Sequence, residues 1–229
     1  MLVRSRLESL ARLTGDTTSL CILASQRVQH ASSDFARIAA MLSWVHAEYA
    51  AQNLRGALEA CIALLTLAPK HREGALLLLR LARTQKDTPL VCDALSRRVA
   101  ASLDPRERAI MLCALARACL DAGDLAAALE HAETALASDP RCAGAALLIV
   151  QHHHELAPQR LLPLLRATRN VLGDTPELLS LLAQAQFGVN DGRAQRETLE
   201  AHLALTQFDP LPALALLTLH ASGNDADAI

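Results

Sequence analysis

Apolar and polar residues along this chain follow the spacing of amphipathic α-helices, and prolines interrupt that pattern at nearly constant intervals. Five of these prolines are separated by 36, 35, 36 and 34 residues, and they are Pro69, Pro105, Pro140, Pro176 and Pro210. Each follows an Ala/Leu-rich stretch, and proline lacks the backbone N–H that a continuing helix needs. The spacing therefore predicts an internal repeat of about 35 residues that begins and ends at helix boundaries.

A second, weaker break lies near the middle of each interval. Gly123-Asp124 and Asp191-Gly192 are two such breaks, and each combines a residue that tolerates positive φ with a helix-capping residue. We therefore expect two helices of about 13 to 15 residues in every interval, joined by a short turn. The expected helix pairs are 1–34, 35–69, 70–105, 106–140, 141–176 and 177–210. A capping helix at 211–220 would complete a single helical repeat domain, 1–220, followed by a polar tail at 221–229.

Small residues recur on one side of the second helix of a pair. Ala128, Ala132 and Ala135 are spaced by four and three residues, which places them on one helix face. Asn53–Pro69 repeats the pattern of Asp124–Pro140 at a constant offset of 71 residues, two repeat lengths. Such a face lets neighbouring helices approach closely, so the pattern predicts stacked helix pairs.

The segment 109–140 resembles a tetratricopeptide repeat (TPR). The residues that carry the resemblance are apolar packing positions, a turn and a closing proline, and they are Leu112, Leu115, Ala116, Gly123, Asp124, Ala128, Ala135 and Pro140. The segment 38–69 is similar through Trp44, Ala57 and Pro69, whereas 70–105, 141–176 and 177–210 keep the length and the proline but lose several small residues. The resemblance implies an all-α fold, a right-handed α-solenoid of about six stacked antiparallel helix pairs plus a C-terminal helix.

Composition favours the same fold class. Hydrophobic residues make up 52% of the 229 residues but aromatic residues only 2%, so the apolar mass is Ala and Leu, which favour helices. The formal net charge is −2, which gives no general case for binding nucleic acid or an anionic membrane. No run of about 18 apolar residues is present, and the first residues alternate charge with Leu, so we expect neither a membrane span nor a signal peptide. The six cysteines form no CxxC pair and are expected to be reduced, mostly buried thiols of a cytoplasmic protein.

No motif for catalysis or for a cofactor is found in the sequence, so we expect no enzyme activity, cofactor or metal. The run His152-His153-His154 would point in three directions about 100° apart on a helix, so one metal ion could not be held by all three. Cys113 and Cys119 lie six residues apart on different helix faces, which is typical of inert packing thiols.

The resemblance to TPR proteins implies that the first helix of each pair lines a concave groove that binds another protein or a peptide. The residues expected on that face are His46, Tyr49, Arg80, Arg83, Arg117, Asp121, Gln151, His154, Phe187 and Asn190. Its three arginines favour an acidic peptide or a C-terminal carboxylate. Trp44 is expected in the core.

The leading hypothesis is therefore an adaptor or scaffold that binds a partner segment in the groove. One alternative is a chaperone for a secreted or assembling client, which predicts a more apolar groove. Another is a regulatory or oligomerising subunit of a larger complex, which predicts self-association through the exposed ends. A metal-dependent enzyme is an alternative of a different class, for which elemental analysis is the test.

Overall fold

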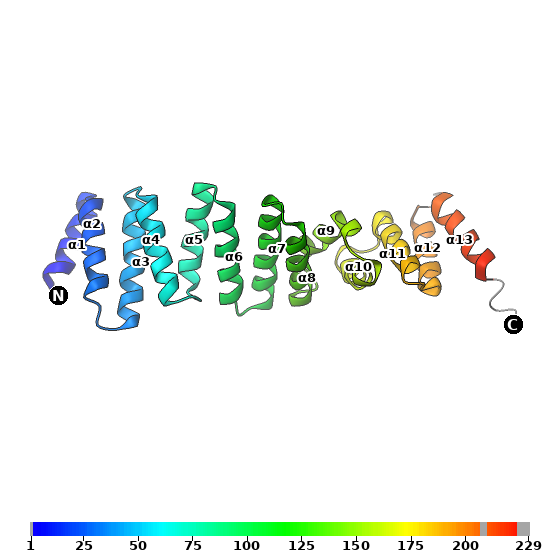
Figure 1. Cartoon of the computed structure of the whole chain (residues 1–229), viewed down its shortest axis with the longest axis horizontal. Helices are drawn as coiled ribbons and strands as arrows, with labels where there is room; N and C mark the ends of the chain where they lie inside the picture. The colour runs from blue at the N-terminus through cyan, green and yellow to red at the C-terminus, as the bar shows by residue number, and fades with distance from the viewer. Residues whose placement is uncertain (1, 207–209, 224–229) are drawn as a thin grey trace. The chain divides into compact units, whose positions relative to one another are not determined.

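The computed structural model describes residues 2–206 and 210–223, and within those ranges every regular element is a helix. Figure 1 labels the thirteen α-helices of the described residues, which follow one another in chain order. The chain forms two compact units, 1–103 with 121–123 and 104–120 with 124–229. The all-α fold of successive helix pairs predicted from the sequence is confirmed, while the expectation of one domain and of a right-handed solenoid stays a prediction.

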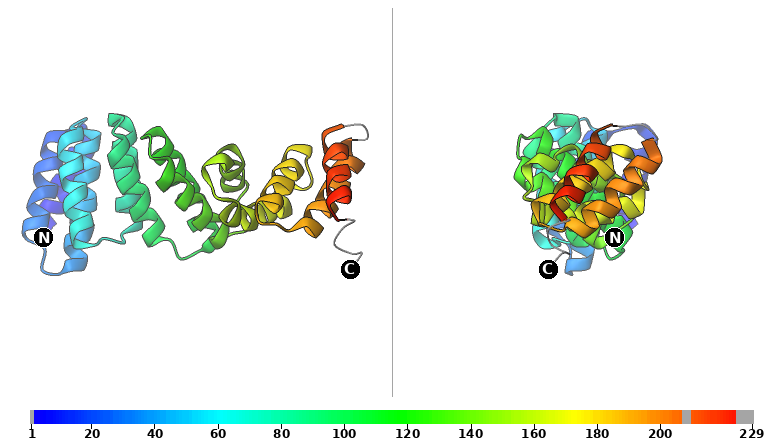
Figure 2. Two further views of the ribbon diagram at one scale, coloured as in Figure 1. Left: turned by 45° about the vertical axis from the view of Figure 1, so that its right-hand side comes forward. Right: turned by 90° about the vertical axis from the view of Figure 1, so that its right-hand side faces the viewer.

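The first unit contains three helix pairs joined by short turns. Its helices are α1 (Leu2–Thr14), α2 (Thr17–Gln29), α3 (Asp34–Ala50), α4 (Leu54–Leu67), α5 (Arg72–Gln85) and α6 (Thr88–Ala101). Each helix packs against the next one along the chain. The left view of Figure 2 shows these helices from a further direction.

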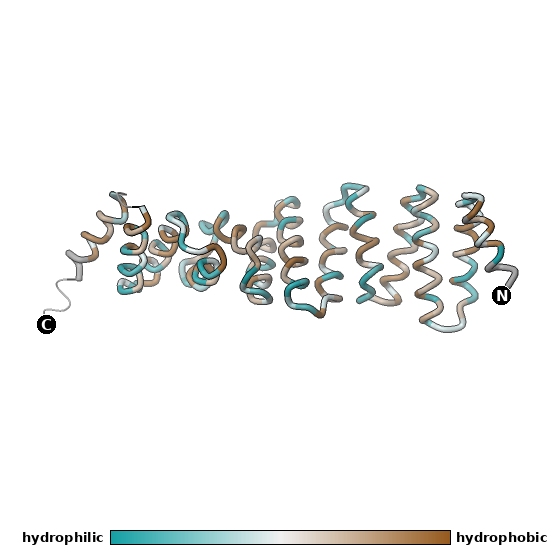
Figure 3. The backbone as a smooth tube through the Cα atoms, turned by 180° about the vertical axis from the view of Figure 1, so that it is seen from behind, coloured by the Kyte–Doolittle hydropathy of each residue, from teal (hydrophilic) through white to brown (hydrophobic). Residues whose placement is uncertain are grey.

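The second unit contains the remaining helices. They are α7 (Pro105–Asp121, within this unit up to Leu120), α8 (Leu125–Ser138), α9 (Ala143–Gln151), the 3₁₀ helix η1 (His153–Glu155), α10 (Pro158–Leu172), α11 (Pro176–Gly188), α12 (Gly192–Thr206) and α13 (Pro210–Gly223). From α8 to α13 each α-helix packs against the next, and α7 reaches the first turn of α9. Hydrophobic and hydrophilic residues alternate along most helices, as the colours of the backbone tube in Figure 3 show.

Side-chain caps explain where the second helices begin. Asn53 and Asp124, the residues at the matched positions of two repeats, accept hydrogen bonds of 3.1 Å from the amide of Gly56 and 3.0 Å from the amide of Ala127. Each bond satisfies an N–H that the first turn of a helix leaves without an intrahelical partner. Asp16, Asp87 and Asp191 cap α2, α6 and α12 in the same way.

The repeating prolines mark helix boundaries. Pro105, Pro176 and Pro210 are the first residues of α7, α11 and α13, where a missing N–H costs nothing and the fixed φ suits a helix. Pro69 and Pro140 lie instead in the turns that follow α4 and α8. The proline period thus identifies the junctions between helix pairs.

Close approach between pairs depends on small residues. Gly74 in the first turn of α5 faces α4, and a Cβ built there would lie 3.0 Å from Cδ2 of Leu64 and 3.1 Å from Cδ2 of Leu65. Ala57 and Ala60 on α4 are fully buried beside these leucines. The side chain at residue 74 is therefore limited by the packing of α4 against α5.

The histidine run does not form the continuous helix assumed from the sequence. The helix α9 ends at Gln151, and the run continues into η1. Further along, Ala157 precedes Pro158 and is extended, with φ −62° and ψ 144°, so a break before α10 is required in any case. The chain turns before α10 and buries Leu156 on the way.

Two burial predictions were also wrong. Trp44 is half-buried and not a core residue, because its indole N–H bonds to Glu48 at the edge of α3. Four of the six cysteines are half-buried, and only Cys61 and Cys119 are buried. Two of the half-buried cysteines, Cys113 and Cys142, line a surface hollow.

The C-terminal helix extends further than predicted. The helix α13 runs to Gly223, into the segment expected to be a polar tail, and 224–229 lie outside the described residues. Among the helices of the described residues, none has the length and apolarity that crossing a membrane requires.

Candidate partner-binding surfaces

In the first unit, the predicted site residues of α3 lie beside the start of α5. Nε2 of His46 is 3.3 Å from Oε1 of Glu73, and both side chains are about half exposed. Tyr49, one turn further along α3, is half-buried. His46 also borders a hollow of about 360 Å³ between α2 and α3. The imidazole therefore joins two helices and remains open to solvent.

Arg80 and Arg83 lie on one side of α5, three residues apart, and both side chains are exposed. Among the described residues neither guanidinium has an ion-pair partner, whereas Arg97 on α6 pairs with Asp93 at 2.9 Å. Arg117 belongs to the second unit. A combined groove of all three arginines stays a prediction.

In the second unit, Arg117 is exposed and lies one turn after Cys113 on α7. Cys113 borders a hollow of about 560 Å³ between α7 and the first turn of α9, lined also by Arg106, Ile110 and Cys142. The remaining predicted residue of α7, Asp121, is exposed at the end of the helix and falls in the first unit.

The histidine segment offers no metal site. Gln151 is exposed at the end of α9, and Nε2 of His154 lies 3.3 Å from Oε1 of the adjacent Glu155. His153 contacts the carbonyl oxygen of Val150 through Nδ1 at 2.9 Å. Across residues 2–206 and 210–223, no group of three His, Cys, Asp or Glu side chains is placed to hold a metal ion.

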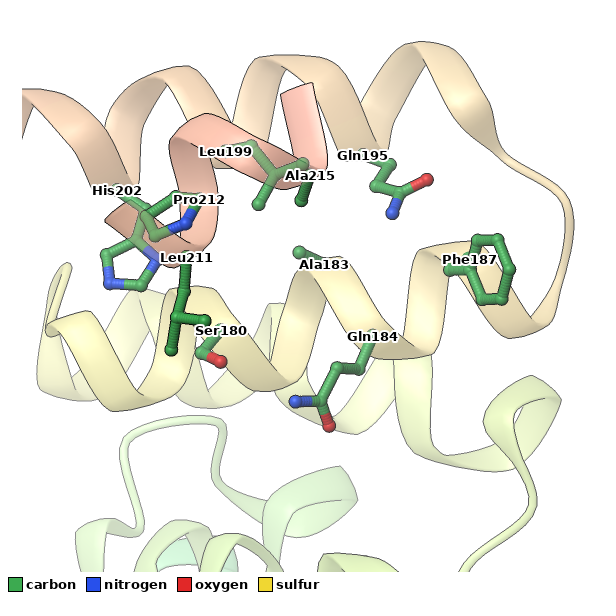
Figure 4. Close-up of a pocket in the computed structure, with 10 residues that line it drawn as sticks. All are labelled: Ser180, Ala183, Gln184, Phe187, Gln195, Leu199, His202, Leu211, Pro212 and Ala215. Carbon is green, nitrogen blue, oxygen red and sulfur yellow. The ribbon is translucent and has the colours of Figure 1, made fainter. Parts of the chain in front are cut away.

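A cavity that contains a predicted residue lies between α11, α12 and α13. Figure 4 shows this cavity of about 430 Å³ and the side chains around it. The lining residues are Ser180, Ala183, Gln184, Phe187, Gln195, Leu199, His202, Leu211, Pro212 and Ala215. The ring of Phe187 is 69% exposed at one end of the cavity, while Leu199 is buried in its wall.

Two polar residues of this cavity were not identified from the sequence. Gln195 and His202 on α12 are only 9% and 6% exposed, and among the described residues neither side chain has a hydrogen-bond partner. Both can donate and accept hydrogen bonds. Their signal in the sequence is spacing, because Gln195, Leu199 and His202 recur at four and three residues on one helix face. Polar residues within an apolar stripe could have marked the site.

Asn190 has a local structural role. Its φ is +59°, in the left-handed region, in the turn that joins α11 to α12. Asparagine tolerates this region better than most residues do. The Asn190 side chain is exposed, so a role in binding stays a prediction beside the role in the turn.

Neither a protein-family model nor a curated protein matches the sequence. Among solved structures, a TPR protein from Parabacteroides merdae is similar at 10% identity and a TM-score of 0.48, over 89% of this chain and 80% of that one. MamA is similar at 14% identity and a TM-score of 0.43, over 80% of this chain and 95% of that one. The kinesin light chain TPR-like repeats from Podosopora anserina are similar at 17% identity and a TM-score of 0.41, over 90% of this chain and 94% of that one.

The described fold is that of a helical repeat protein built from successive antiparallel helix pairs. Solved structures similar to this chain include proteins with TPR or TPR-like repeats. Identities of 17% and below concern the fold alone, and what the chain binds must be argued from its own surfaces.

Proposed function

We propose that this chain is a non-catalytic adaptor that binds a segment of another protein, with one apolar side chain of that segment seated between α11, α12 and α13. The observation that carries the proposal is the cavity of about 430 Å³, with Phe187 exposed at its end and two buried polar side chains in its wall. Its size falls in the range of roughly 300–1,000 Å³ typical of binding sites.

The lining of the cavity defines the occupant. Part of the cavity wall is apolar and is formed by Ala183, Leu199 and Ala215. This wall favours a Leu-like or Phe-like side chain of the partner. Gln195 and His202 offer donors and acceptors at the same site. The backbone of a bound peptide carries both kinds of group, so it can satisfy the two polar residues while its side chain fills the apolar space. An exposed aromatic residue beside a pocket is the kind of anchor that carries much of a binding energy.

A finer part of the proposal concerns charge. Arg80 and Arg83 are exposed and unpaired among the described residues, which supports a partner segment that carries acidic residues. Such a partner would dissociate more readily as salt rises, because exposed charges are screened. The cytoplasmic location expected from the sequence is part of the same proposal.

The test is selection from a random peptide library displayed on phage, with the intact 229-residue protein immobilised. Selected peptides are synthesised, and their affinities for the parent and for Phe187→Ala are measured by fluorescence anisotropy. We expect Phe187→Ala to weaken binding at least tenfold, which corresponds to about 1.4 kcal/mol. For selected peptides that carry acidic residues, binding to Arg80→Ala/Arg83→Ala is measured separately, and we expect it to be weaker at low salt and nearly unchanged at high salt.

The matched control is Phe35→Ala, which removes another exposed phenylalanine, 84% exposed on α3 in the first unit. Circular dichroism establishes that each variant is folded. Peptides that bind the parent, Phe35→Ala and Phe187→Ala equally would overturn the assignment of the cavity. A library that yields no binder would overturn the adaptor proposal itself.

A second candidate function, self-association, has its own observation. Exposed leucines recur at every third residue on two helices. On α1 they are Leu7, Leu10 and Leu13, and on α13 they are Leu211, Leu214 and Leu217. The segment 2–14 holds three arginines and one glutamate, whereas 210–229 holds two aspartates and no Lys or Arg. Apolar rows on segments of opposite charge favour contact between copies. Light scattering over a concentration series tests this, and Leu214→Glu should shift the protein to a monomer.

A further inference from the structure

Cys113 and Cys142 meet in the second unit although 29 residues separate them. Cys113 lies in the middle of α7, and Cys142 is the N-cap residue of α9. Sγ of Cys142 is 3.9 Å from the carbonyl oxygen of Ala109. In an α-helix that carbonyl oxygen accepts a hydrogen bond from the backbone amide of the residue four positions later, which here is Cys113. The sulfur of Cys142 therefore lies against the turn of α7 that carries Cys113.

The thiol of Cys113 likewise lies against the helix that begins beside Cys142. A Cβ built at Gly144 would lie 2.7 Å from Sγ of Cys113, so the thiol rests on the first turn of α9, two residues after Cys142. No larger residue at 144 would leave that space. The Cys142 side chain also raises the pKa of the Cys113 thiol, which is the influence of a close neighbour. Each thiol thus lies against the helix turn that carries the other, and rotation of the two side chains can bring the sulfurs to the geometry of a disulfide.

Both thiols can be reached from solvent. They are half-buried and line the same hollow of about 560 Å³, whereas Cys61 and Cys119 lie in the core. Burial raises the pKa of the Cys113 thiol, and the neighbouring Cys142 raises it further, while the Arg117 guanidinium opposes the shift. The Cys113 side chain is thus mainly a protonated thiol near neutral pH, and its thiolate fraction grows as pH rises.

We propose that Cys113 and Cys142 form a reversible modification site, at which a low-molecular-weight disulfide such as glutathione disulfide oxidises the pair to an intramolecular disulfide. One cysteine thiolate attacks the glutathione disulfide, forms a mixed disulfide and releases one glutathione thiolate, which takes up a proton. The second cysteine loses its proton and attacks the cysteine sulfur of that mixed disulfide, which releases the second glutathione. Two protein thiols are oxidised, and one glutathione disulfide is reduced to two glutathione thiols.

The cross-link would join two consecutive helix pairs. It ties α7 to the start of α9 and replaces two thiols in the wall of the hollow with one disulfide. Because it closes a chain segment of about 30 residues, it restricts the unfolded chain and should raise the melting temperature of the protein by several degrees. The modification is independent of the proposed binding function.

Trypsin separates the relevant thiols, which makes the test direct. Cleavage after Arg108, Arg117, Arg141 and Arg160 places Cys113 in 109–117, Cys119 in 118–141 and Cys142 in 142–160. The native protein is brought to equilibrium in glutathione buffers of graded ratio at mildly alkaline pH, remaining thiols are alkylated, and the digest is read by mass spectrometry. We expect peptide 109–117 joined to 142–160 in the monomer, with the intact protein lighter by two hydrogens.

Single variants and another half-buried thiol provide the controls. In Cys113→Ser and in Cys142→Ser the remaining cysteine should carry a glutathione instead of a protein cross-link. Cys92 on α6 lies in the first unit, so the Cys92→Ser variant should form the cross-link as the parent does. The rise in melting temperature on oxidation should be present in the parent and absent in Cys142→Ser.

Three results would overturn the proposal. The first is glutathione bound separately to Cys113 and to Cys142 in the parent. The second is a cross-link through the peptide that contains Cys119, or one found only between two copies of the chain. The third is the absence of the 109–117 to 142–160 peptide even in the most oxidising buffer.

Discussion

The indole N–H of Trp44 donates a hydrogen bond of 2.8 Å to Oε1 of Glu48, one turn later on α3. The second oxygen of that carboxylate accepts a bond of 2.8 Å from Nδ2 of Asn53. Oδ1 of Asn53 in turn caps α4 through the amide of Gly56. One carboxylate therefore connects the only tryptophan of the chain to the start of the next helix.

This network predicts an unusual response at Gly56. Replacing a glycine inside a helix by alanine ordinarily stabilises the protein by up to about 1 kcal/mol. A Cβ at Gly56, however, would lie 2.5 Å from Nδ2 of Asn53 and 2.9 Å from Oε2 of Glu48. We expect Gly56→Ala to lower the free energy of unfolding by about 1 to 2 kcal/mol, measured by urea denaturation.

The control is Gly192→Ala at the start of α12, where the nearest atom to a new Cβ is Cδ2 of Leu219 at 3.8 Å. That is an ordinary contact, so this variant should be unchanged or slightly more stable. Equal stabilisation by both substitutions would contradict the position of the Asn53 and Glu48 side chains.

Glu48 also acts on a thiol. The pKa of Cys21 is raised to about 11, first by burial and then by the charge and hydrogen bonding of Glu48. Glu48→Gln removes the negative charge, so the pKa should fall while burial keeps it above the ordinary value. A lower pKa means more thiolate, and we expect faster alkylation of Cys21 by iodoacetamide at mildly alkaline pH. The rate at Cys92 serves as the reference, and an unchanged pH–rate profile at Cys21 would contradict the contact.

The ion pair between Arg169 and Asp174 predicts how the stability of the protein depends on pH. The hydrogen bond from Arg169 lowers the pKa of Asp174, and Nη2 of Arg169 lies 2.8 Å from Oδ2 of Asp174. The pKa of Asp174 is lower in the folded protein than in the unfolded chain, where it is near 3.9. The ion pair therefore contributes its full stability at pH values above that unfolded pKa, and this stability is lost as the pH falls through the folded pKa. Both side chains are partly exposed, so we expect Asp174→Asn to cost less than about 1 kcal/mol at neutral pH.

Urea denaturation of the parent and of Asp174→Asn at neutral and at strongly acid pH measures this dependence. The difference between the two proteins should shrink as the pH falls. A difference that stays constant down to strongly acid pH would show that Asp174 contributes through packing and not through its charge.

The helix boundaries could be predicted from the sequence because their signals are local. A proline disfavours the helical conformation in the residue before it, and Asn53 or Asp124 caps the helix that begins at the next residue. The same locality explains the error at the histidine run. The helical period was extended through the run that begins at His152, where no proline or capping side chain signals that α9 ends at Gln151.

The features of the candidate sites depend on contacts between distant residues, and the sequence carries a weaker signal for these. Phe187 was identified as a face residue, but its cavity requires α13 to lie against α12. Cys113 was compared with Cys119, its neighbour in sequence, whereas its neighbour in space is Cys142. No spacing rule links two residues that approach only because α7 reaches the first turn of α9.

The contact between Cys113 and Gly144 can be tested without any oxidant. In Gly144→Ala the new Cβ would lie 2.7 Å from Sγ of Cys113, so the thiol must rotate away or α9 must shift. We expect a loss of about 1 kcal/mol in the free energy of unfolding, although alanine is the better helix former. Cys113→Ala removes the sulfur and therefore the clash.

Combining the two substitutions isolates the contact. In the Cys113→Ala background, Gly144→Ala should cost nothing or stabilise the protein, so the two changes are coupled by about 1 kcal/mol or more. The measurement is urea denaturation of the parent, both single variants and the double variant. Additive effects would mean that the sulfur does not rest on the first turn of α9. The geometry on which the proposed disulfide depends would then be wrong, whatever the redox experiment shows.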